Sequence, residues 1–315
     1  MVNIRDLFDD AKCFPTVRDL RWPDGVACPS CGSASAVRNG RDDTQPDRRR
    51  YECHGFRKRF DDLTGTNFAG HHQPLRTWVA CLYLMGLNLS GLQVARELGV
   101  DKSDARDMIT TLRRGIVAGT PPETLSGEVE CDEVYVVAGH KGHPEAVRKK
   151  GRLGRRRRLR GAPGRGTLEE VKPPIFGMLQ RGGRVVIRMP EDVKQATIRM
   201  LIDATIAPGT LVHTDEDDID SRLEGWGYRH KTVCHGRGRY ARDEDGDGFH
   251  EVHVNTMEGF WSLLRSWLRP HRGIPQESLP LYLAFFQFVH NARARGRALL
   301  GALIAQLLAP PWNPS

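Results

Sequence analysis

Two segments of the sequence place an acid where acids are unusual. Asp132 stands inside the apolar run 129–137, where an aspartate competes for backbone hydrogen bonds and needs a partner once it is buried. With a period of two, Glu130 and Asp132 face the same side of this expected strand. Asp215 ends the run LVHTD, where a side chain can project over the edge of a sheet. Two acids on two strands could share one metal ion.

A third segment, HVNTMEGFWSLLRSWLR, has the spacing of an amphipathic helix. Asn255 and Glu258 are three residues apart and share a polar stripe with Ser262, Arg265 and Arg269. The adjacent stripe is apolar and consists of Met257, Trp261, Leu264 and Leu268. Oxygen ligands of this kind suit Mg²⁺ or Mn²⁺, and a pair of such ions can drive in-line displacement at a phosphate. Arg265 and Arg269 could grip the neighbouring phosphates.

Each acid taken alone has a structural explanation, Asp215 as a cap or turn residue and Glu258 as a solvated helix residue paired to arginine. Together, on a strand, a strand end and a helix in that order, the acids predict a ribonuclease-H-like active site. Asp217 lies close to Asp215 and is an alternative for the second position. The run DEDGDG at 243–248 resembles half of a calcium loop, but Val254 stands where the loop needs Glu, which favours a polar turn.

The elements that must position these residues form an α/β domain. After the break at 121–122, the strand-like runs are GEVECDEVYVV, PPIFGML, RVVIRM and TLVHTD, with a helix expected over 192–206 before the last. A crossover helix between the third and fourth strands predicts a mixed sheet. Helices over 255–268 and 276–307 end the chain.

Two smaller modules are expected before this domain. Residues 20–62 are rich in turn residues and contain two short paired segments, so such a unit needs a metal or a neighbour to hold it. The segment from Ser90 to Arg114 predicts a helix, a break at Gly99 and a second helix capped by Asp101 or Ser103. This is the outline of a helix-turn-helix, although all-α cores contain similar pairs. The expected regions are 1–66, 67–122 and 123–315.

The charge is concentrated in one insert, placed at 141–166. Between Lys141 and Arg165 there are eleven basic residues and one acid, which accounts for more than the whole net charge of +8. Such a block, with Arg155, Arg156, Arg157 and Arg158 at its centre, attracts a polyanion such as DNA, the alternative being a solvated loop without a partner. Seven unevenly spaced cysteines and the lack of a signal segment or membrane span favour a cytoplasmic protein.

The residues also carry a family resemblance. The segments GEVECDE, TDED, HVNTMEGFWSLLRSWLRPHRGI and FFQFVHNARAR resemble the ISXO-like DDE transposase domain of bacterial insertion sequences, and WPDGVACPSCGS resembles the opening of the zinc ribbon that precedes it. The resemblance implies that Asp132 and Asp215 are the first two catalytic acids. It implies that Asn255 and Glu258 supply the third position, where Glu258 is the better metal ligand because a carboxylate carries charge. DNA cleavage at element ends, strand transfer to target DNA and a homo-oligomer on DNA follow as expectations.

The ribbon departs from the family pattern. Cys28, Cys31 and Cys53 are three of the four ligands that zinc requires, and Phe56 stands where the fourth is expected. Cys13 or His54 could substitute, or the site could bind no zinc. The lost cysteine also motivates an alternative function, a non-catalytic DNA-binding regulator or decayed transposase.

Overall fold

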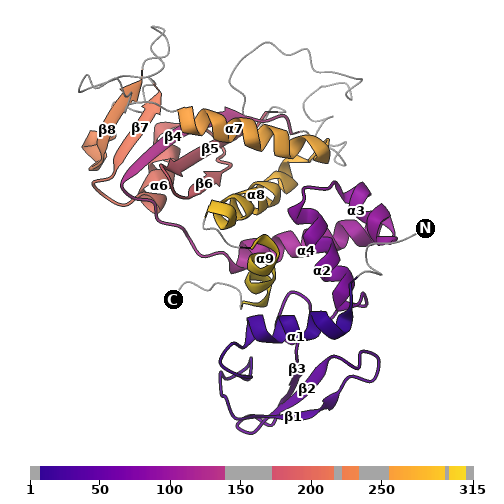
Figure 1. Cartoon of the computed structure of the whole chain (residues 1–315). Coiled ribbons are helices and arrows are strands. Elements are labelled where there is room, and N and C mark those ends of the chain that lie inside the picture. Colours follow the sequence, from indigo (N-terminus) through magenta and orange to yellow (C-terminus); the bar gives the residue numbers. More distant parts are fainter. Residues whose placement is uncertain (1–7, 139–171, 216–221, 234–254, 295–297, 310–315) are drawn as a thin grey trace. The chain divides into compact units, whose positions relative to one another are not determined.

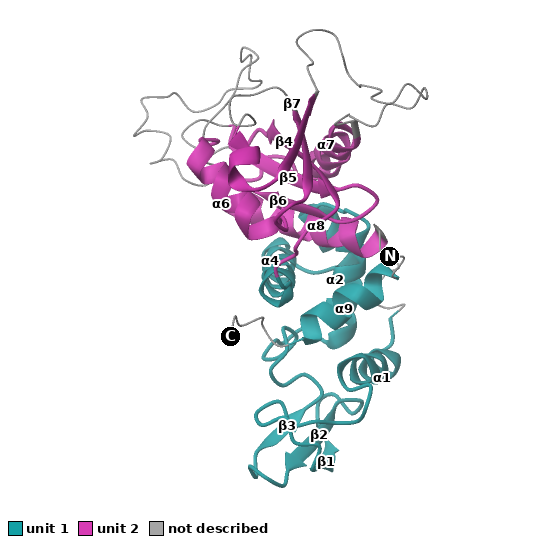
Figure 2. Cartoon of the chain, turned by 90° about the vertical axis from the view of Figure 1, so that its left-hand side faces the viewer, with its two compact units in different colours: residues 1–121, 295–315 teal, residues 122–294 magenta. Residues whose placement is uncertain are grey.

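The computed structural model describes residues 8–138, 172–215, 222–233, 255–294 and 298–309 (Figure 1). The central arginines 155–158 of the basic insert, Asp217 and the acidic run 243–248 lie outside the described residues. The chain forms two compact units, which are drawn in different colours in Figure 2. Unit 1 comprises residues 1–121 and 295–315, and unit 2 comprises residues 122–294.

Unit 1 begins with one helix and a three-stranded antiparallel sheet. The helix is α1 (Asp10–Arg21), and the strands are β1 (Ala36–Arg41), β2 (Arg49–Cys53) and β3 (Arg59–Asp61), in that order across the sheet. Asp9 caps α1 by accepting a hydrogen bond from the N–H of Ala11 at 2.9 Å. The two paired segments expected from the sequence were 28–31 and 48–60. The second contains β2 and most of β3, whereas β1 and α1 were not expected.

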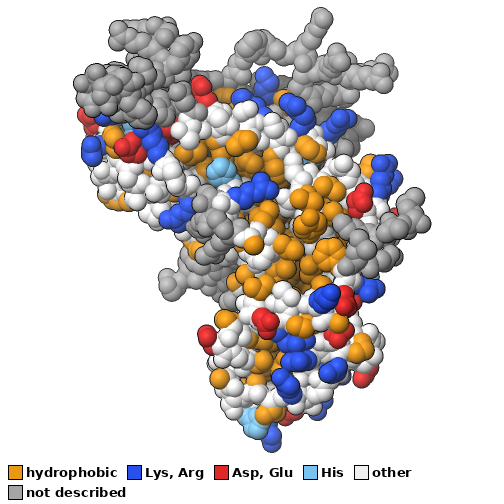
Figure 3. Space-filling view, viewed as in Figure 1, with side chains coloured by type: hydrophobic (Ala, Val, Ile, Leu, Met, Phe, Trp, Pro, Cys, Tyr) orange, Lys and Arg blue, Asp and Glu red, His pale blue; other side chains and the backbone are white. Residues whose placement is uncertain are grey.

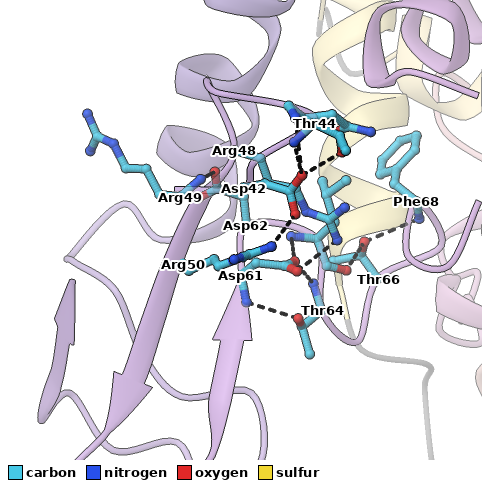
Figure 4. A network of polar contacts seen from close by, with 12 residues as sticks. Asp42, Thr44, Arg48, Arg49, Arg50, Asp61, Asp62, Thr64, Thr66 and Phe68 are labelled. Atoms are coloured by element: carbon cyan, nitrogen blue, oxygen red, sulfur yellow. Dashed lines mark hydrogen bonds and ion pairs between the residues drawn. The ribbon is translucent and has the colours of Figure 1, made fainter. Parts of the chain in front are cut away.

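Buried polar contacts join α1 to this sheet, whose apolar cluster is small. The carboxylate of Asp62 is fully buried and pairs with Arg18 of α1 at 3.0 Å. It also accepts hydrogen bonds from the N–H of Arg49 at 2.7 Å and the hydroxyl of Tyr51 at 3.2 Å. Figure 4 shows the neighbouring contacts, among them the ion pairs of Asp61 with Arg48 and of Asp42 with Arg50. These three partners around one buried acid help to fix the strands without a large apolar core.

The rest of unit 1 is helical. Its helices are α2 (Leu75–Gly86), α3 (Gly91–Leu98), α4 (Lys102–Gly119) and α9 (Leu299–Leu308). The turn after α3 contains Gly99 in the left-handed conformation, with φ 61°, and Asp101 then caps α4 by accepting from the N–H of Ser103 at 2.8 Å. The expected pair of helices is therefore present, although α4 continues past Arg114 to Gly119.

Unit 2 contains a five-stranded mixed sheet in the order β6-β5-β4-β7-β8. The strands are β4 (Glu128–Tyr135), β5 (Pro174–Gln180), β6 (Val185–Arg188), β7 (Leu211–Asp215) and β8 (Arg229–Val233). β4, β5 and β6 pair antiparallel, whereas β7 runs parallel to both β4 and β8. This confirms the mixed α/β class, while β8 was not expected because Arg229, His230 and Lys231 hide its pattern.

Helices cover both faces of this sheet. α6 (Gln195–Thr205) lies between β6 and β7 in the chain and packs with Val129, Cys131 and other residues of one face. α7 (Asn255–Leu268) and α8 (Leu279–Ala294) pack on the opposite face. The 3₁₀ turns of this unit are η3 (Glu224–Trp226), η5 (Arg269–His271) and η6 (Gln276–Ser278). The single helix expected over 276–307 is thus divided into η6, α8 and α9. Among the described residues, no helix is long and apolar enough to span a membrane.

Candidate active site and metal-binding cysteines

Asp132 lies within β4, and two hydrogen bonds fix its half-buried side chain. Its Oδ1 accepts from the N–H of Glu133 at 2.7 Å, and its Oδ2 accepts from the indole Nε1–H of Trp261 on α7 at 2.8 Å. The carboxylate therefore lies on the face of the sheet that α7 covers. This is the compensation that an aspartate inside an apolar strand requires.

Asp215 is the last residue of β7, which pairs directly with β4. In this parallel ladder Glu130 is opposite His213, and each of the two acids lies two residues further along its own strand. The paired stretch ends at Glu130 and His213, and paired strands are about 4.8 Å apart, so positions 132 and 215 both follow this stretch on adjacent strands. The side chain of Asp215 lies outside the described part of the structure.

The helix α7 begins at Asn255, as the sequence predicted, and its faces are divided by polarity. The exposed residues include Glu258, Ser262, Arg265 and Arg269, the last of which follows the helix in η5, while the buried ones are Met257, Phe260, Trp261, Leu264 and Leu268. Basic side chains gather over α7 in the space-filling view (Figure 3). The exposed stripe therefore combines an acid near the start of the helix with arginines near its end.

A second acid of β4, Glu130, contacts the backbone at the start of α7. Its carboxylate is fully buried, and Oε2 accepts from the backbone N–H of Met257 at 2.9 Å. Oε1 accepts from Nε of Arg181 at 2.9 Å, and Arg181 also pairs with Glu128 at 2.8 Å. The buried charge of Glu130 is thus balanced by a guanidinium and by one of the helix N–H groups that lack intrahelical partners.

His213 of β7 extends the same set of contacts to the strand beside β4. Its Nε2–H donates to Glu128 at 3.2 Å. Burial, and secondly the positive charge of Arg181, lower the pKa of His213 to about 4, so the imidazole is neutral at pH 7. A neutral histidine adds no charge beside positions 132 and 215.

Gly177 of β5 makes the approach of Trp261 to Asp132 geometrically feasible. It is directly opposite Asp132 in the β4–β5 ladder. A Cβ built at this position would lie 2.5 Å from an atom of the Trp261 ring and 3.0 Å from the side chain of Met257. Only glycine leaves room for the indole against the strand.

Sequence reasoning overlooked most of these supporting residues. The sequence pattern predicts that Glu130 shares the face of Asp132 but indicates no partner for it, and it assigns Trp261 only to an apolar stripe. Gly177 and Arg181 gave no signal, because their contacts depend on the register of β5 and on the turn that follows it.

The three ribbon cysteines lie together in unit 1. Their sulfur atoms are all within 4.8 Å of one another, and Sγ of Cys31 is 3.6 Å from Sγ of Cys53. A tetrahedral zinc site with Zn–S bonds of about 2.3 Å puts its sulfurs roughly 3.8 Å apart, so the three thiols fit zinc. Burial tends to raise the pKa of the Cys28 thiol, but hydrogen bonds from the backbone of Ser30 and Cys31 and from the neighbouring thiols lower it below its usual value. Neither Cys13 nor His54 joins this cluster in the described structure.

Two turns of the ribbon share one backbone geometry. The N–H of Gly32 donates to the carbonyl of Cys28 at 2.8 Å, and the N–H of Arg57 donates to the carbonyl of Cys53 at 2.8 Å. Both donors have positive φ, 71° at Gly32 and 55° at Arg57. Cys31 precedes Gly32 as Phe56 precedes Arg57, so Phe56 holds the position equivalent to Cys31. Phe56 is 58% exposed. The second turn therefore keeps the shape of the first while lacking its second thiol.

Comparison with known proteins identifies two family domains in this chain. Residues 124–291 match the family model described as the ISXO2-like transposase domain, and residues 8–55 match the transposase zinc-ribbon domain. A relative from Halobacterium salinarum, named as an uncharacterized protein in transposable element ISH50, is 33% identical over 315 residues, covering 98% of this chain and 100% of the relative. A solved intasome of simian T-cell lymphotropic virus in complex with PP2A regulatory subunit B56 gamma covers 66% of this chain and 68% of its own, with a TM-score of 0.28 and 9% identity, values too low to support an argument. The family match and the relative together show that this chain belongs to the insertion-sequence transposases with an ISXO2-like transposase domain and a zinc-ribbon domain.

Proposed function

We propose that this protein catalyses metal-dependent DNA cleavage and strand transfer of its insertion sequence through a DDE-type site. The observation that supports the proposal is the parallel pairing of β4 with β7, because Asp132 and Asp215 each follow the paired stretch on these adjacent strands and Asp132 lies on the face that α7 covers. The mixed sheet with this helix is what a ribonuclease-H-like catalytic domain requires. Membership of the transposase family supports the same reaction.

The proposed ligands are the carboxylates of Asp132, Asp215 and Glu258. Hard oxygen donors of this kind suit Mg²⁺ or Mn²⁺. Asn255 starts the helix that carries Glu258 and is the alternative third ligand, but Glu258 is favoured because its charge offsets that of a cation. Divalent ions held there would activate the attacking hydroxyl and stabilise the leaving oxygen. The hydrogen bonds from Trp261 and the backbone of Glu133 hold Asp132 in one orientation for this purpose.

DNA is the proposed partner, and several exposed basic groups could contact its backbone. Arg265 and Arg269 continue the stripe of Glu258, so they could hold phosphates beside the one that reacts. The ribbon exposes further basic side chains, namely Arg38, Arg41, Arg57, Lys58 and Arg59. We propose that α3 and α4 act as a helix-turn-helix on the element ends and that the protein works as a homo-oligomer, since two ends must be joined.

A strand-transfer assay on DNA that carries the element ends tests the catalytic assignment. Asp132→Ala, Asp215→Ala and Glu258→Ala are each expected to lower cleavage by several orders of magnitude, while binding of end DNA without metal persists. Glu191→Ala is the matched control, because Glu191 is an exposed acid of the same unit, and it should retain full activity. Full activity of the Asp132 or Asp215 variant would refute the proposed site.

The incomplete set of ribbon cysteines favours one second candidate, a DNA-binding regulator or decayed transposase without catalysis. DNA binding that persists while neither Mg²⁺ nor Mn²⁺ supports nicking would establish this alternative.

The basic insert has its own test, since its arginines Arg155, Arg156, Arg157 and Arg158 lie outside the described residues. Deleting residues 148–160 should weaken binding to DNA of any sequence and flatten its salt dependence, because fewer counterions are released. An unchanged salt slope would show that these arginines do not contact DNA.

A further inference from the structure

The start of α7 is tied to β4 at two points. Oε2 of Glu130 accepts from the N–H of Met257 in the first turn, and Oδ2 of Asp132 accepts from Nε1 of Trp261 one turn later. These contacts set the position of the helix along the strand. The proposed third ligand, Glu258, lies in the sequence between the two helix residues that are held.

Burying the carboxylate of Glu130 costs desolvation free energy, which argues that this side chain has a specific role. A fully buried carboxylate loses its hydration, and only paired and hydrogen-bonded charges are tolerated in such a place. Here both oxygens have strong donors, Arg181 on one side and the helix N–H on the other. Apolar residues also lie on this face, among them Leu179, which is opposite Glu130 in the β4–β5 ladder, so an apolar residue at position 130 could pack against them. An apolar residue could not accept a hydrogen bond from the backbone N–H of Met257 at the start of α7.

We propose that Glu130 is a positioning residue, whose carboxylate holds the first turn of α7, and with it Glu258, at a fixed place relative to Asp132. The idea rests on the proposed function, since the distance between Asp132 and Glu258 matters only if both bind the same metal ions. Groups that orient metal ligands affect metal affinity or activity by about 10- to 100-fold when removed. Glu130 itself contacts neither DNA nor metal in this proposal.

Glu130→Gln tests the proposal, with Glu128→Gln as its matched control. The two glutamates share Arg181, but in the described contacts only Glu130 also reaches α7. In Glu130→Gln the amide has a single acceptor oxygen for two donors, so the bond to Met257 or the bond to Arg181 is lost. The variant should exchange the amide hydrogens of residues 255–261 faster than wild type and should need about 10- to 100-fold more Mg²⁺ for half-maximal cleavage. Glu128→Gln should change neither quantity markedly.

A second variant, Glu130→Asp, tests the proposal if Glu130→Gln does not fold. Glu130→Asp keeps the negative charge beside Arg181 but is one methylene too short to bridge Arg181 and Met257, so it should show the same two changes. Unchanged exchange in α7 together with an unchanged Mg²⁺ requirement in a folded variant would overturn the positioning role. If wild type itself does not cleave DNA with Mg²⁺, the proposed function fails, whereas the exchange comparison still decides whether Glu130 holds α7.

Discussion

At the scale of single residues, one glycine decides how closely α7 can approach the sheet. Gly177 is opposite Asp132, and the ring of Trp261 occupies the space that a side chain at position 177 would need. The same indole donates the hydrogen bond that orients Asp132. The absence of one Cβ is therefore linked to the orientation of a proposed metal ligand.

Gly177→Ala should lower stability and disturb this hydrogen bond. The added Cβ would lie 2.5 Å from the Trp261 ring, and forcing extra volume into a packed core costs about 1–3 kcal/mol. Chemical denaturation followed by tryptophan fluorescence would measure the loss. Gly259→Ala is the control on α7, because a Cβ there meets nothing within 4 Å and alanine favours a helix by about 1 kcal/mol. A Gly177 variant as stable as wild type would show that Trp261 can move without cost.

At the scale of elements, the two ribbon turns have the same backbone geometry although only the first carries two cysteines. Gly32 and Arg57 have the same φ sign and the same hydrogen bond to the carbonyl of a preceding cysteine. Arginine is rarely found at positive φ, so keeping Arg57 in this turn costs conformational free energy. Restoring the missing thiol should therefore need no change of backbone.

Phe56→Cys should complete a four-thiolate zinc site. A fourth ligand should tighten zinc binding by on the order of tenfold or more, since about 1.4 kcal/mol corresponds to a factor of ten. Competition with a chromophoric chelator would measure the affinity, and Phe56→Ser, which removes the ring without adding a thiol, is the control. Equal affinities in the two variants would show that position 56 does not face the cluster of Cys28, Cys31 and Cys53.

Elements with local signals were predictable from the sequence, and their pairing was not. Apolar runs revealed β4, β5, β6 and β7, and the cap at Asp101 with the break at Gly99 revealed the turn between α3 and α4. The placement of Asp132 and Asp215 on adjacent strands depends instead on how β7 returns beside β4 after α6. The acids of the candidate site could thus be listed from their settings, while their roles as ligands stay a prediction.

At the scale of the whole molecule, the last helix belongs to the first unit. α9 packs with α1, α2 and α4, and its residues Leu303 and Leu307 are fully buried. Asn67 also donates from Nδ2 to the carbonyl of Leu307 at 3.1 Å. No local sequence pattern predicts that α9 packs on the N-terminal helices, because any apolar helix face can pack against any other.

Leu307→Ala should therefore loosen unit 1 selectively. Removing a buried leucine side chain costs about 2–5 kcal/mol, and the lost contacts lie with helices at the other end of the sequence. Hydrogen exchange should accelerate in α1, α2 and α4 but not in β4, β5 or β7. Leu264→Ala is the reciprocal variant, because Leu264 is fully buried in the cluster between α7 and the sheet, and it should accelerate exchange in unit 2 alone. If both substitutions raise exchange equally in both units, the chain unfolds as one cooperative body and the prediction of selective loosening is wrong.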